Sequence, residues 1–318
     1  MALDLSAIRA ARQRIAGRLH VTPTITAMRL GDRVKVSLFL KCENLQKTGS
    51  FKVRGVLNKL SHLDKAERDR GVITVSAGNH AQALAWGAKS EGIKATVVMF
   101  ETASPAKVEA CRGYGAEVVL YGASGIQSFA KAYELQAERN LTFVHPFDDE
   151  LVGAGAGTVA LELLEQSPEL DVIVIPVGGG GLISGMLPAI KEQNPKIRVY
   201  GVEPKGASSM RQSLDQGHAV KLDAINTIAD GLGAPMAGDL NYEIVKKYVD
   251  DIVLIDDAMI GAAVGEVLSN TKQLVETAGA AATAAILNRA IPLRDGERVA
   301  AVLSGGNIDF PKLKGLLT

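Results

Sequence analysis

Cysteine is scarce in this chain, and long hydrophobic runs are missing. The 318 residues include two cysteines, Cys42 and Cys111, and neither belongs to a CxxC pair. A disulfide framework needs more cysteines, so a reducing compartment is the simpler interpretation and we expect a cytoplasmic protein. No apolar run reaches the roughly 18 residues of a membrane span. We therefore expect no membrane partner.

A surplus of charge of either sign is missing as well. Lysine and arginine together number 35, as do aspartate and glutamate. Without a basic surplus we expect no nucleic-acid partner. Hydrophobic residues make up 47% and charged residues 22%, as in an ordinary globular enzyme. The length allows two domains or one large domain.

Short apolar stretches alternate with helical patterns along most of the chain. The strands are predicted at 36–43, 71–76, 94–100, 116–122, 171–177, 196–204, 250–256 and at the start of 298–309. Helices are predicted at 79–92, 104–115, up to about residue 140, and at 257–276. This order predicts β-α-β units and parallel sheets with helices on both faces. No low-complexity linker interrupts it, so we expect two closely packed α/β domains.

Four consecutive glycines are the strongest local signal. The stretch PVGGGGLISG (176–185) runs from a predicted strand into a predicted helix. Glycine lets a ligand approach the backbone closely, and the N–H groups at a helix N-terminus bind anions. A plain tight turn needs fewer glycines, so this loop predicts a phosphate site. It matches neither GxxxxGK[ST] nor a clean GxGxxG with an acidic ribose partner, which argues against a nicotinamide oxidoreductase.

Two further loops follow predicted strands. In SAGNHAQALA (76–85), Ser76, Gly78 and Asn79 lie where backbone N–H groups are free to bind a carboxylate, although a plainly capped helix explains them about as well. In LSGGNID (303–309), Ser304 follows a late strand. In parallel sheets ligands bind at the carboxyl ends of the strands, so both loops are candidate parts of one site.

Six motifs in order resemble one enzyme family. They are KCENLQKTGSFKVRG, SAGNHAQALA, PVGGGGLISG, TIADG, ETAGA and LSGGNID, and they span nearly the whole chain. Together they resemble the fold-type II pyridoxal-phosphate enzymes, and within these the threonine/serine dehydratases and serine racemases. The resemblance implies an α/β fold of two open twisted parallel-sheet domains, like that of the tryptophan synthase β chain. It also implies a discontinuous large cofactor-binding domain (1–65 plus 148–318), a small domain (66–147) and a homodimer.

The resemblance assigns the cofactor, pyridoxal 5'-phosphate, to a set of residues. Lys52 corresponds to the family lysine that forms a Schiff base with the cofactor aldehyde, and a lowered pKa makes such a lysine useful as nucleophile and base. The other implied cofactor contacts are Phe51, Asn79, Gly178, Gly179, Gly180, Gly181, Leu182, Gly231, Glu276 and Ser304. Asn79 corresponds to the residue at the ring hydroxyl. Ser304 corresponds to the one at the pyridine nitrogen, where a serine gives no charge partner and elimination is favoured over transamination.

The same resemblance implies a reaction on a small amino-acid substrate. Ser76, Asn79 and His80 would surround the substrate carboxylate. The implied reaction is β-elimination of L-threonine or L-serine to a 2-oxo acid and ammonia, with Lys52 removing the Cα proton. A serine racemase needs a second base on the other cofactor face, where this chain has Ala77. Because alanine transfers no proton, a dehydratase is the favoured prediction.

Further positions depart from the family pattern. Ala156 replaces a glutamine in AGAGT, which brings 3-hydroxyaspartate and phenylserine into play as substrates. Glu203 and Ala207 match a divalent-metal site of some relatives, but the third ligand position is Ser209, so Mg²⁺ is an uncertain second cofactor. Lys47 and Thr48 match nucleotide contacts of some racemases, and we favour a loop-forming role for them.

Two other hypotheses differ in class from a dehydratase. A β-replacement enzyme such as a cysteine synthase would share the cofactor fold, but SAGNHAQ and ETAGA favour a dehydratase. A non-catalytic amino-acid binder is disfavoured because Lys52 and Ser304 are both retained.

Overall fold

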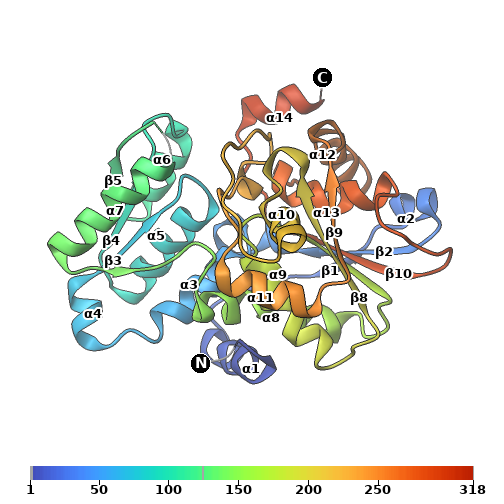
Figure 1. The fold of residues 1–318 in the computed structure, drawn as a ribbon, viewed down its shortest axis with the longest axis horizontal. Helices are drawn as coiled ribbons and strands as arrows, with labels where there is room; N and C mark the ends of the chain where they lie inside the picture. Colours follow the sequence, from blue (N-terminus) through green and yellow to red (C-terminus); the bar gives the residue numbers. More distant parts are fainter. Residues whose placement is uncertain (1–2, 124, 318) are drawn as a thin grey trace.

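Two β-sheets form the framework of the protein (Figure 1). The computed structural model describes residues 3–123 and 125–317. The larger sheet has the strand order β1-β2-β10-β7-β8-β9, and the smaller sheet has the order β5-β4-β3-β6. All strand pairs are parallel except β1 with β2. The α/β class with parallel sheets is therefore confirmed, while the antiparallel edge strand β1 was not predicted.

The strands agree closely with the apolar stretches of the sequence. The larger sheet contains β1 (Thr24–Thr26), β2 (Ser37–Cys42), β7 (Val172–Pro176), β8 (Arg198–Pro204), β9 (Asp251–Ile255) and β10 (Arg298–Leu303). The smaller sheet contains β3 (Val72–Val75), β4 (Ala95–Met99), β5 (Glu117–Leu120) and β6 (Thr142–Phe143). Every residue of β7, β3 and β4 is buried, as expected of central strands covered on both faces.

Helices cover both sheets. The first half contains α1 (Leu5–Ile15), α2 (Met28–Val34), α3 (Lys52–Leu60), α4 (Lys65–Arg70), α5 (Asn79–Glu91), α6 (Pro105–Gly113) and α7 (Gly125–Arg139). The second half contains α8 (Glu150–Gln166), α9 (Gly181–Lys191), α10 (Ser209–Gln216), α11 (Asp239–Tyr248), α12 (Asp257–Thr271), α13 (Thr277–Leu287) and α14 (Phe310–Leu317). Within the described residues, each helix is too short or too polar to cross a membrane.

Four short 3-10 turns join these elements, namely η1 (Glu43–Leu45), η2 (Lys47–Gly49), η3 (Lys205–Ala207) and η4 (Asp230–Leu232). The helix predicted over 257–276 is wrong at its C-terminal end. It stops at Thr271 because Lys272 adopts a left-handed conformation (φ 61°) and donates its N–H back to the carbonyl of Leu268. A new helix begins at Thr277.

The two sheets draw on separate parts of the chain. All four strands of the smaller sheet lie between residues 72 and 143, inside the predicted small domain (66–147). The strands of the larger sheet lie at 24–42 and 172–303, on either side of it. Figure 1 shows the smaller sheet and its helices as the cyan and green part of the molecule, beside the larger sheet. The domain limits themselves stay a prediction.

Helix α3 is packed unusually close to its neighbours, and this fixes where its first residue, Lys52, lies. A Cβ on Gly155 of α8 would lie 2.4 Å from the carbonyl oxygen of Arg54 in α3. A Cβ on Gly157 would lie 2.4 Å from the carbonyl oxygen of Gly185 in α9. Glycine is therefore required at both positions for α3, α8 and α9 to approach each other.

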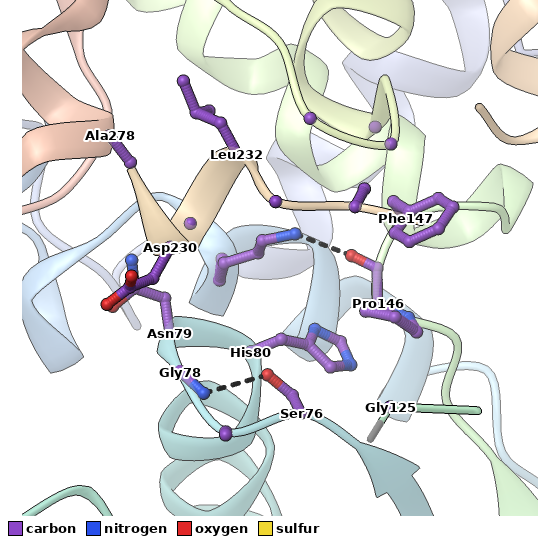
Figure 2. A pocket seen from close by; sticks show the side chains of 18 of the residues that line it. Ser76, Gly78, Asn79, His80, Gly125, Pro146, Phe147, Asp230, Leu232 and Ala278 are labelled. Carbon is purple, nitrogen blue, oxygen red and sulfur yellow. Dashed lines mark hydrogen bonds between the residues drawn. The ribbon is translucent and has the colours of Figure 1, made fainter. Parts of the chain in front are cut away.

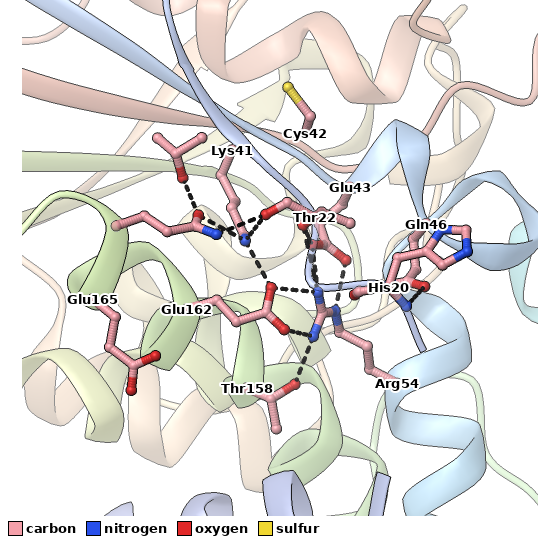
Figure 3. A network of polar contacts seen from close by, with 12 residues as sticks. His20, Thr22, Lys41, Cys42, Glu43, Gln46, Arg54, Thr158, Glu162 and Glu165 are labelled. Carbon is pink, nitrogen blue, oxygen red and sulfur yellow. Dashed lines mark hydrogen bonds and ion pairs between the residues drawn. The ribbon is translucent and has the colours of Figure 1, made fainter. Parts of the chain in front are cut away.

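A buried group of charges ties α3 to α8 and to the end of β2 (Figure 3). The guanidinium of Arg54 donates to Glu43 at 2.7 Å and to Glu162 at 2.7 Å, and Lys41 donates to Glu162 at 2.7 Å. All four side chains are less than a tenth exposed. The two cations and two carboxylates balance, and Thr22 supplies a further contact through its hydroxyl, which donates to Glu43.

We predict that Arg54→Met destabilises the protein by about 3–5 kcal/mol, because Glu43 loses its ion pair and the buried group is left with two carboxylates and one cation, Lys41. The matched control is Arg12→Met, which removes the cation of an exposed pair with Glu165, one helical turn from Glu162. That change should cost about 0–1 kcal/mol. Urea unfolding followed by circular dichroism measures both. Equal, small losses in the two variants would show that the buried group contributes no more than a surface pair.

Candidate active site

One cavity lies between the two sheets and gathers the predicted cofactor and substrate residues (Figure 2). Its volume is about 300 Å³. Among the predicted residues, those that line it are Phe51, Lys52, Ser76, Asn79, His80, Gly178, Gly179, Gly180, Gly181, Leu182, Gly231, Glu276 and Ser304. They come from segments that are far apart in the sequence but meet at the carboxyl ends of parallel strands, as expected for open α/β sheets.

Lys52 begins helix α3 at the wall of this cavity. Its ammonium donates to the carbonyl oxygen of Pro146 at 2.7 Å, and among the described residues no carboxylate forms an ion pair with it. Burial lowers the pKa of Lys52 to about 8, with the more distant Glu276 opposing the shift. The N–H of Phe51 donates to the carbonyl oxygen of Ser304 at 3.1 Å, which joins the start of α3 to the end of β10. Phe51 thus orients the lysine toward the cavity.

The glycine loop is held with its carbonyl groups turned away from the cavity. The carbonyl oxygen of Gly179 accepts from the side-chain amide of Asn241 at 2.8 Å and from the N–H of Gly238 at 3.1 Å. In a trans peptide the N–H points opposite to the C=O, so the N–H of Gly180 points away from Asn241. A Cβ on Gly179 would lie 2.5 Å from the Phe147 ring, so no larger residue fits there.

The same loop presents free donors. In the part of the chain that the structure describes, no protein oxygen accepts from the N–H groups of residues 178–183. Helix α9 begins within this stretch, so its positive dipole end reinforces them. Gly180 adopts φ +92°, a conformation that favours glycine. Donors, dipole and open backbone together have the features of an anion-binding site.

A second group of free donors lies at the start of α5. The helix is capped by Gly78, which no side chain assists, and the hydroxyl of Ser76 accepts from the N–H of Gly78 at 3.2 Å. Figure 2 shows Ser76, Gly78, Asn79 and His80 together on this side of the cavity. The hydroxyl of Ser76 therefore shapes the turn, while the first N–H groups of α5 remain available for a carboxylate.

The His80 side chain cannot supply such a donor. Its Nε2 lies 3.1 Å from the carbonyl oxygen of Val144, which only accepts, so the ring proton is on Nε2. Burial lowers the pKa of His80 to about 3, so the ring stays neutral and Nδ1 carries a lone pair. Among the described residues Nδ1 has no hydrogen-bond partner. A carboxylate would therefore contact the backbone N–H of His80 and not its ring.

Asn79 and Glu276 meet across the cavity. The side-chain amide of Asn79 donates to the Glu276 carboxylate. Burial raises the pKa of Glu276 to about 7, and the hydrogen bond from Asn79 opposes this shift. A Cβ on Gly305, the residue after Ser304, would lie 2.3 Å from the same carboxylate. Glu276 is thus packed against the end of β10 as well as against α5.

Sequence reasoning missed several residues of the site. Asp230 and Lys107 both line the cavity, and their charged groups lie 3.5 Å apart. Lys312 of α14 donates to Asp230 at 3.0 Å. Pro146 was missed because its role is played by a backbone carbonyl, which no motif reveals. Asp230 stands inside the quoted motif TIADG, so a signal for it was present.

The structure locates two of the residues that depart from the family pattern, Ala77 and Ala156. Ala77 lines the cavity, so a side chain there would face the site. Ala156 is 2% exposed and packs in the hydrophobic core around α8 and α9; it is not among the described residues that line the cavity. Ala156 therefore forms no part of the cavity wall, and its effect on the choice of substrate stays a prediction.

The predicted metal and nucleotide residues lie outside this cavity. Both carboxylate oxygens of Glu203 accept backbone N–H groups of Met210 and Arg211, at 2.9 and 2.8 Å. Among the described residues no group of three His, Cys, Asp or Glu side chains is placed to hold a metal ion. Lys47 donates to the carbonyl oxygen of Arg18 at 2.8 Å, which joins η2 to the segment after α1. The roles suggested for Glu203 with Ala207, and for Lys47 with Thr48, stay predictions.

Comparison with known proteins places the chain in a family. Residues 15–305 match the model of the family described as pyridoxal-phosphate dependent enzyme. The chain therefore belongs to the pyridoxal-phosphate dependent enzymes, as the six sequence motifs predicted.

Individual relatives are similar over nearly all of the chain. An L-threonine ammonia-lyase of Geobacter sulfurreducens is 43% identical over 96% of this chain and 76% of its own length. A catabolic L-threonine dehydratase of Staphylococcus aureus is 40% identical over 99% of this chain and 92% of its own. The structure of maize serine racemase superimposes with a TM-score of 0.95 at 39% identity, covering 99% of this chain and 97% of that one. Dehydratases and a racemase are thus both similar to this protein.

We predict that the cofactor-free protein reacts with pyridoxal phosphate at a rate that rises with pH around a midpoint near 8. The neutral amine is the nucleophile, and burial lowers the pKa of Lys52 from its usual 10.5. Absorbance in stopped flow measures the rate. Lys52→Ala should lose this phase, and Lys65→Ala, on an exposed helix, should keep it. A midpoint near 10.5, or a phase that survives Lys52→Ala, would refute the assignment.

Proposed function

We propose that the protein is a pyridoxal-phosphate ammonia-lyase that converts a β-hydroxy amino acid into a 2-oxo acid and ammonia. The observation that carries this proposal is the shared cavity, in which an amine of lowered pKa, Lys52, faces two separate groups of free backbone N–H donors. One group suits a phosphate and the other suits a carboxylate. Such an arrangement serves a phosphorylated cofactor and an amino-acid substrate together.

The residues present fit this cofactor. The N–H groups of residues 178–182 would hold the phosphate, and the amine of Lys52 would hold the aldehyde carbon. Asn79 offers a side-chain N–H for the ring hydroxyl, and Ser304 offers only a hydroxyl for the pyridine nitrogen. Gly231 and Glu276 complete the wall on the side of α13. Bound there, pyridoxal phosphate supplies an electron sink that weakens the Cα–H bond of an attached amino acid.

Each protein group then has a defined task. The neutral amine of Lys52 takes the Cα proton, which a lysine of ordinary pKa would do poorly near neutral pH. The N–H groups at the start of α5 orient the carboxylate, with Ser76 holding the turn that exposes them. Ser304 leaves the pyridine nitrogen without a charge partner. Bound pyridoxal phosphate would then be a weaker electron sink, which would favour elimination over transamination.

L-Threonine and L-serine are the substrates we propose. The relatives named L-threonine ammonia-lyase and L-threonine dehydratase support this choice, because their similarity covers nearly the whole chain. Dehydration of 3-hydroxyaspartate or phenylserine is the alternative, although its original support, Ala156, lies in the core. Serine racemisation is the second candidate, favoured by the fit to maize serine racemase. Against it, Ala77 places a methyl group where a second base would be needed.

The decisive test supplies the cofactor-loaded protein with L-threonine, L-serine, 3-hydroxyaspartate and phenylserine, and measures 2-oxo acid release. We expect release from threonine or serine, reduced by about 10²–10⁴-fold in Lys52→Ala because the general base is lost. Chiral chromatography of the remaining serine measures racemisation in the same samples. Arg12→Met, far from the cavity on α1, serves as the unaffected control.

The possible results separate the candidate functions. Turnover of hydroxyaspartate or phenylserine alone would replace the proposed substrate. Formation of D-serine without release of a 2-oxo acid would make the protein a racemase. Neither product from any substrate would refute β-elimination.

We also propose that the protein forms a homodimer. Val21, Leu45 and Leu274 are apolar yet 72%, 44% and 42% exposed. They lie together, because His20 contacts the carbonyl oxygen of Leu45 and Asn44 donates to that of Leu274. Exposed apolar groups of this kind mark interfaces. Sedimentation should show a dimer that Val21→Lys with Leu274→Lys weakens, while a monomer at every concentration would contradict the proposal.

Two minor proposals concern the surroundings of the protein. Cys42 and Cys111 are both buried free thiols, which fits a reducing cytoplasm, and fractionation of the producing cells would test this location. Mg²⁺ at Glu203 stays the weaker proposal, because no group of three His, Cys, Asp or Glu side chains among the described residues is placed to hold it.

A further inference from the structure

A chain of side-chain amides runs from the loop before Lys52 to the cavity wall. The amide nitrogen of Asn307 donates to the carbonyl oxygen of Thr48 and to the side-chain oxygen of Asn79, both at 2.7 Å. The amide nitrogen of Asn79 then donates to Glu276. The four residues come from η2, the segment after β10, the start of α5 and the start of α13. Of these, Asn79 and Glu276 line the cavity and Asn307 lies behind them.

The donor and acceptor roles along this chain of amides are fixed by the carbonyl group of Thr48. A backbone carbonyl only accepts, so the atom of Asn307 that faces Thr48 must be its NH₂ group. The same NH₂ group faces Asn79, and therefore the atom of Asn79 that meets it must be the oxygen. The NH₂ group of Asn79 is then left for Glu276 and the cavity. An amide that could turn freely would have no such preference.

Two backbone segments enclose the side chain of Asn307. A Cβ on Gly49 would lie 2.4 Å from the side-chain oxygen of Asn307, and Gly49 adopts φ +71°. The carbonyl oxygen of Gly49 also accepts from the N–H of Gly306 at 2.9 Å, which binds the η2 turn to the segment after β10. Asn307 is therefore clamped between two backbone segments.

We propose that Asn307 is a positioning residue that commits Asn79 to act as a hydrogen-bond donor toward the cavity. This inference rests on the proposed function, because the group that receives the bond is the ring hydroxyl of pyridoxal phosphate. A donor there stabilises the ionised hydroxyl. If Asn79 were reversed, its carbonyl oxygen would face both the ring oxygen and the Glu276 carboxylate, and acceptors would meet acceptors.

The test is Asn307→Asp, which keeps the shape but replaces the donor by an acceptor. Asn79 must then turn its NH₂ group toward Asp, and its oxygen toward the cavity. We expect the cofactor to bind about ten-fold or more weakly, since a hydrogen bond to a charged oxygen is lost. We also expect the absorbance of the bound cofactor to shift from the ionised-hydroxyl band to the neutral-hydroxyl band. Asn307→Ala should give a smaller shift, because Asn79 is then free to take either orientation.

The matched control is Asn44→Asp. Asn44 also donates its NH₂ group to two oxygens, those of Gln273 and Leu274, and it packs against Gly306, but it does not line the cavity among the described residues. Binding and spectrum should stay within about two-fold of the unchanged protein, since no hydrogen bond to the cofactor is affected. Thermal unfolding of each cofactor-free variant reports separately on folding.

Three results would overturn the proposal. The first is a folded Asn307→Asp protein with unchanged cofactor affinity and unchanged bands. The second is a loss in Asn44→Asp as large as in Asn307→Asp, which would show a structural effect only. The third is that the protein without any substitution binds no cofactor at Lys52, which would overturn the proposed function as well. If Asn307→Asp fails to fold, a shift in Asn307→Ala toward the neutral-hydroxyl band supports the proposal, and its absence overturns it.

Discussion

The buried guanidinium of Arg54 is the contact on which the position of the reactive lysine depends. Arg54 lies two residues after Lys52 on α3 and holds Glu43 at the end of β2 and Glu162 on α8. This buried group of two cations, Arg54 and Lys41, and two carboxylates is stable only while every partner stays in place. Because glycines also bring α8 against α3 at this point, α3 can neither slide nor rotate without breaking ion pairs. The ammonium of Lys52 is placed in the cavity by charges that lie outside it.

Within the cavity, burial moves ionisable groups toward their neutral forms. The pKa of Lys52 falls to about 8, that of His80 falls to about 3, and that of Glu276 rises to about 7. Anions must therefore be held mainly by backbone N–H groups and helix dipoles. These donors need no counter-ion and do not titrate, so the proposed role of Lys52 in proton transfer does not require it to hold an anion as well.

Much of the fold and of the site follows from the sequence, and what does not follow has a common cause. Apolar periodicity predicted the strands. The rule that loops at the carboxyl ends of strands carry ligands pointed to Asn79 and Ser304, and the family resemblance added Lys52. Local patterns carry no information on partners that are distant in sequence. Asn307 contacts Asn79 across 228 positions, and the burial of Ala156 depends on helices that only the folded chain brings together. Residue roles that depend on such distant partners could be recognised only in the folded structure.

The bond between α3 and α8 has a further consequence for how the chain is organised. The chain leaves the larger sheet through α3 and returns through α8, so the whole four-stranded sheet is an insertion between these two helices. Arg54 and Glu162 join the two ends of that insertion in the larger sheet's own core. The ion pair already holds the two ends of the insertion together. The residues between these ends therefore form a closed loop, and closing it costs little further conformational entropy. Helix α3 also packs in the hydrophobic core of the smaller sheet, through residues such as Val56 and Leu60, so any loosening of that sheet would reach the helix that carries the lysine.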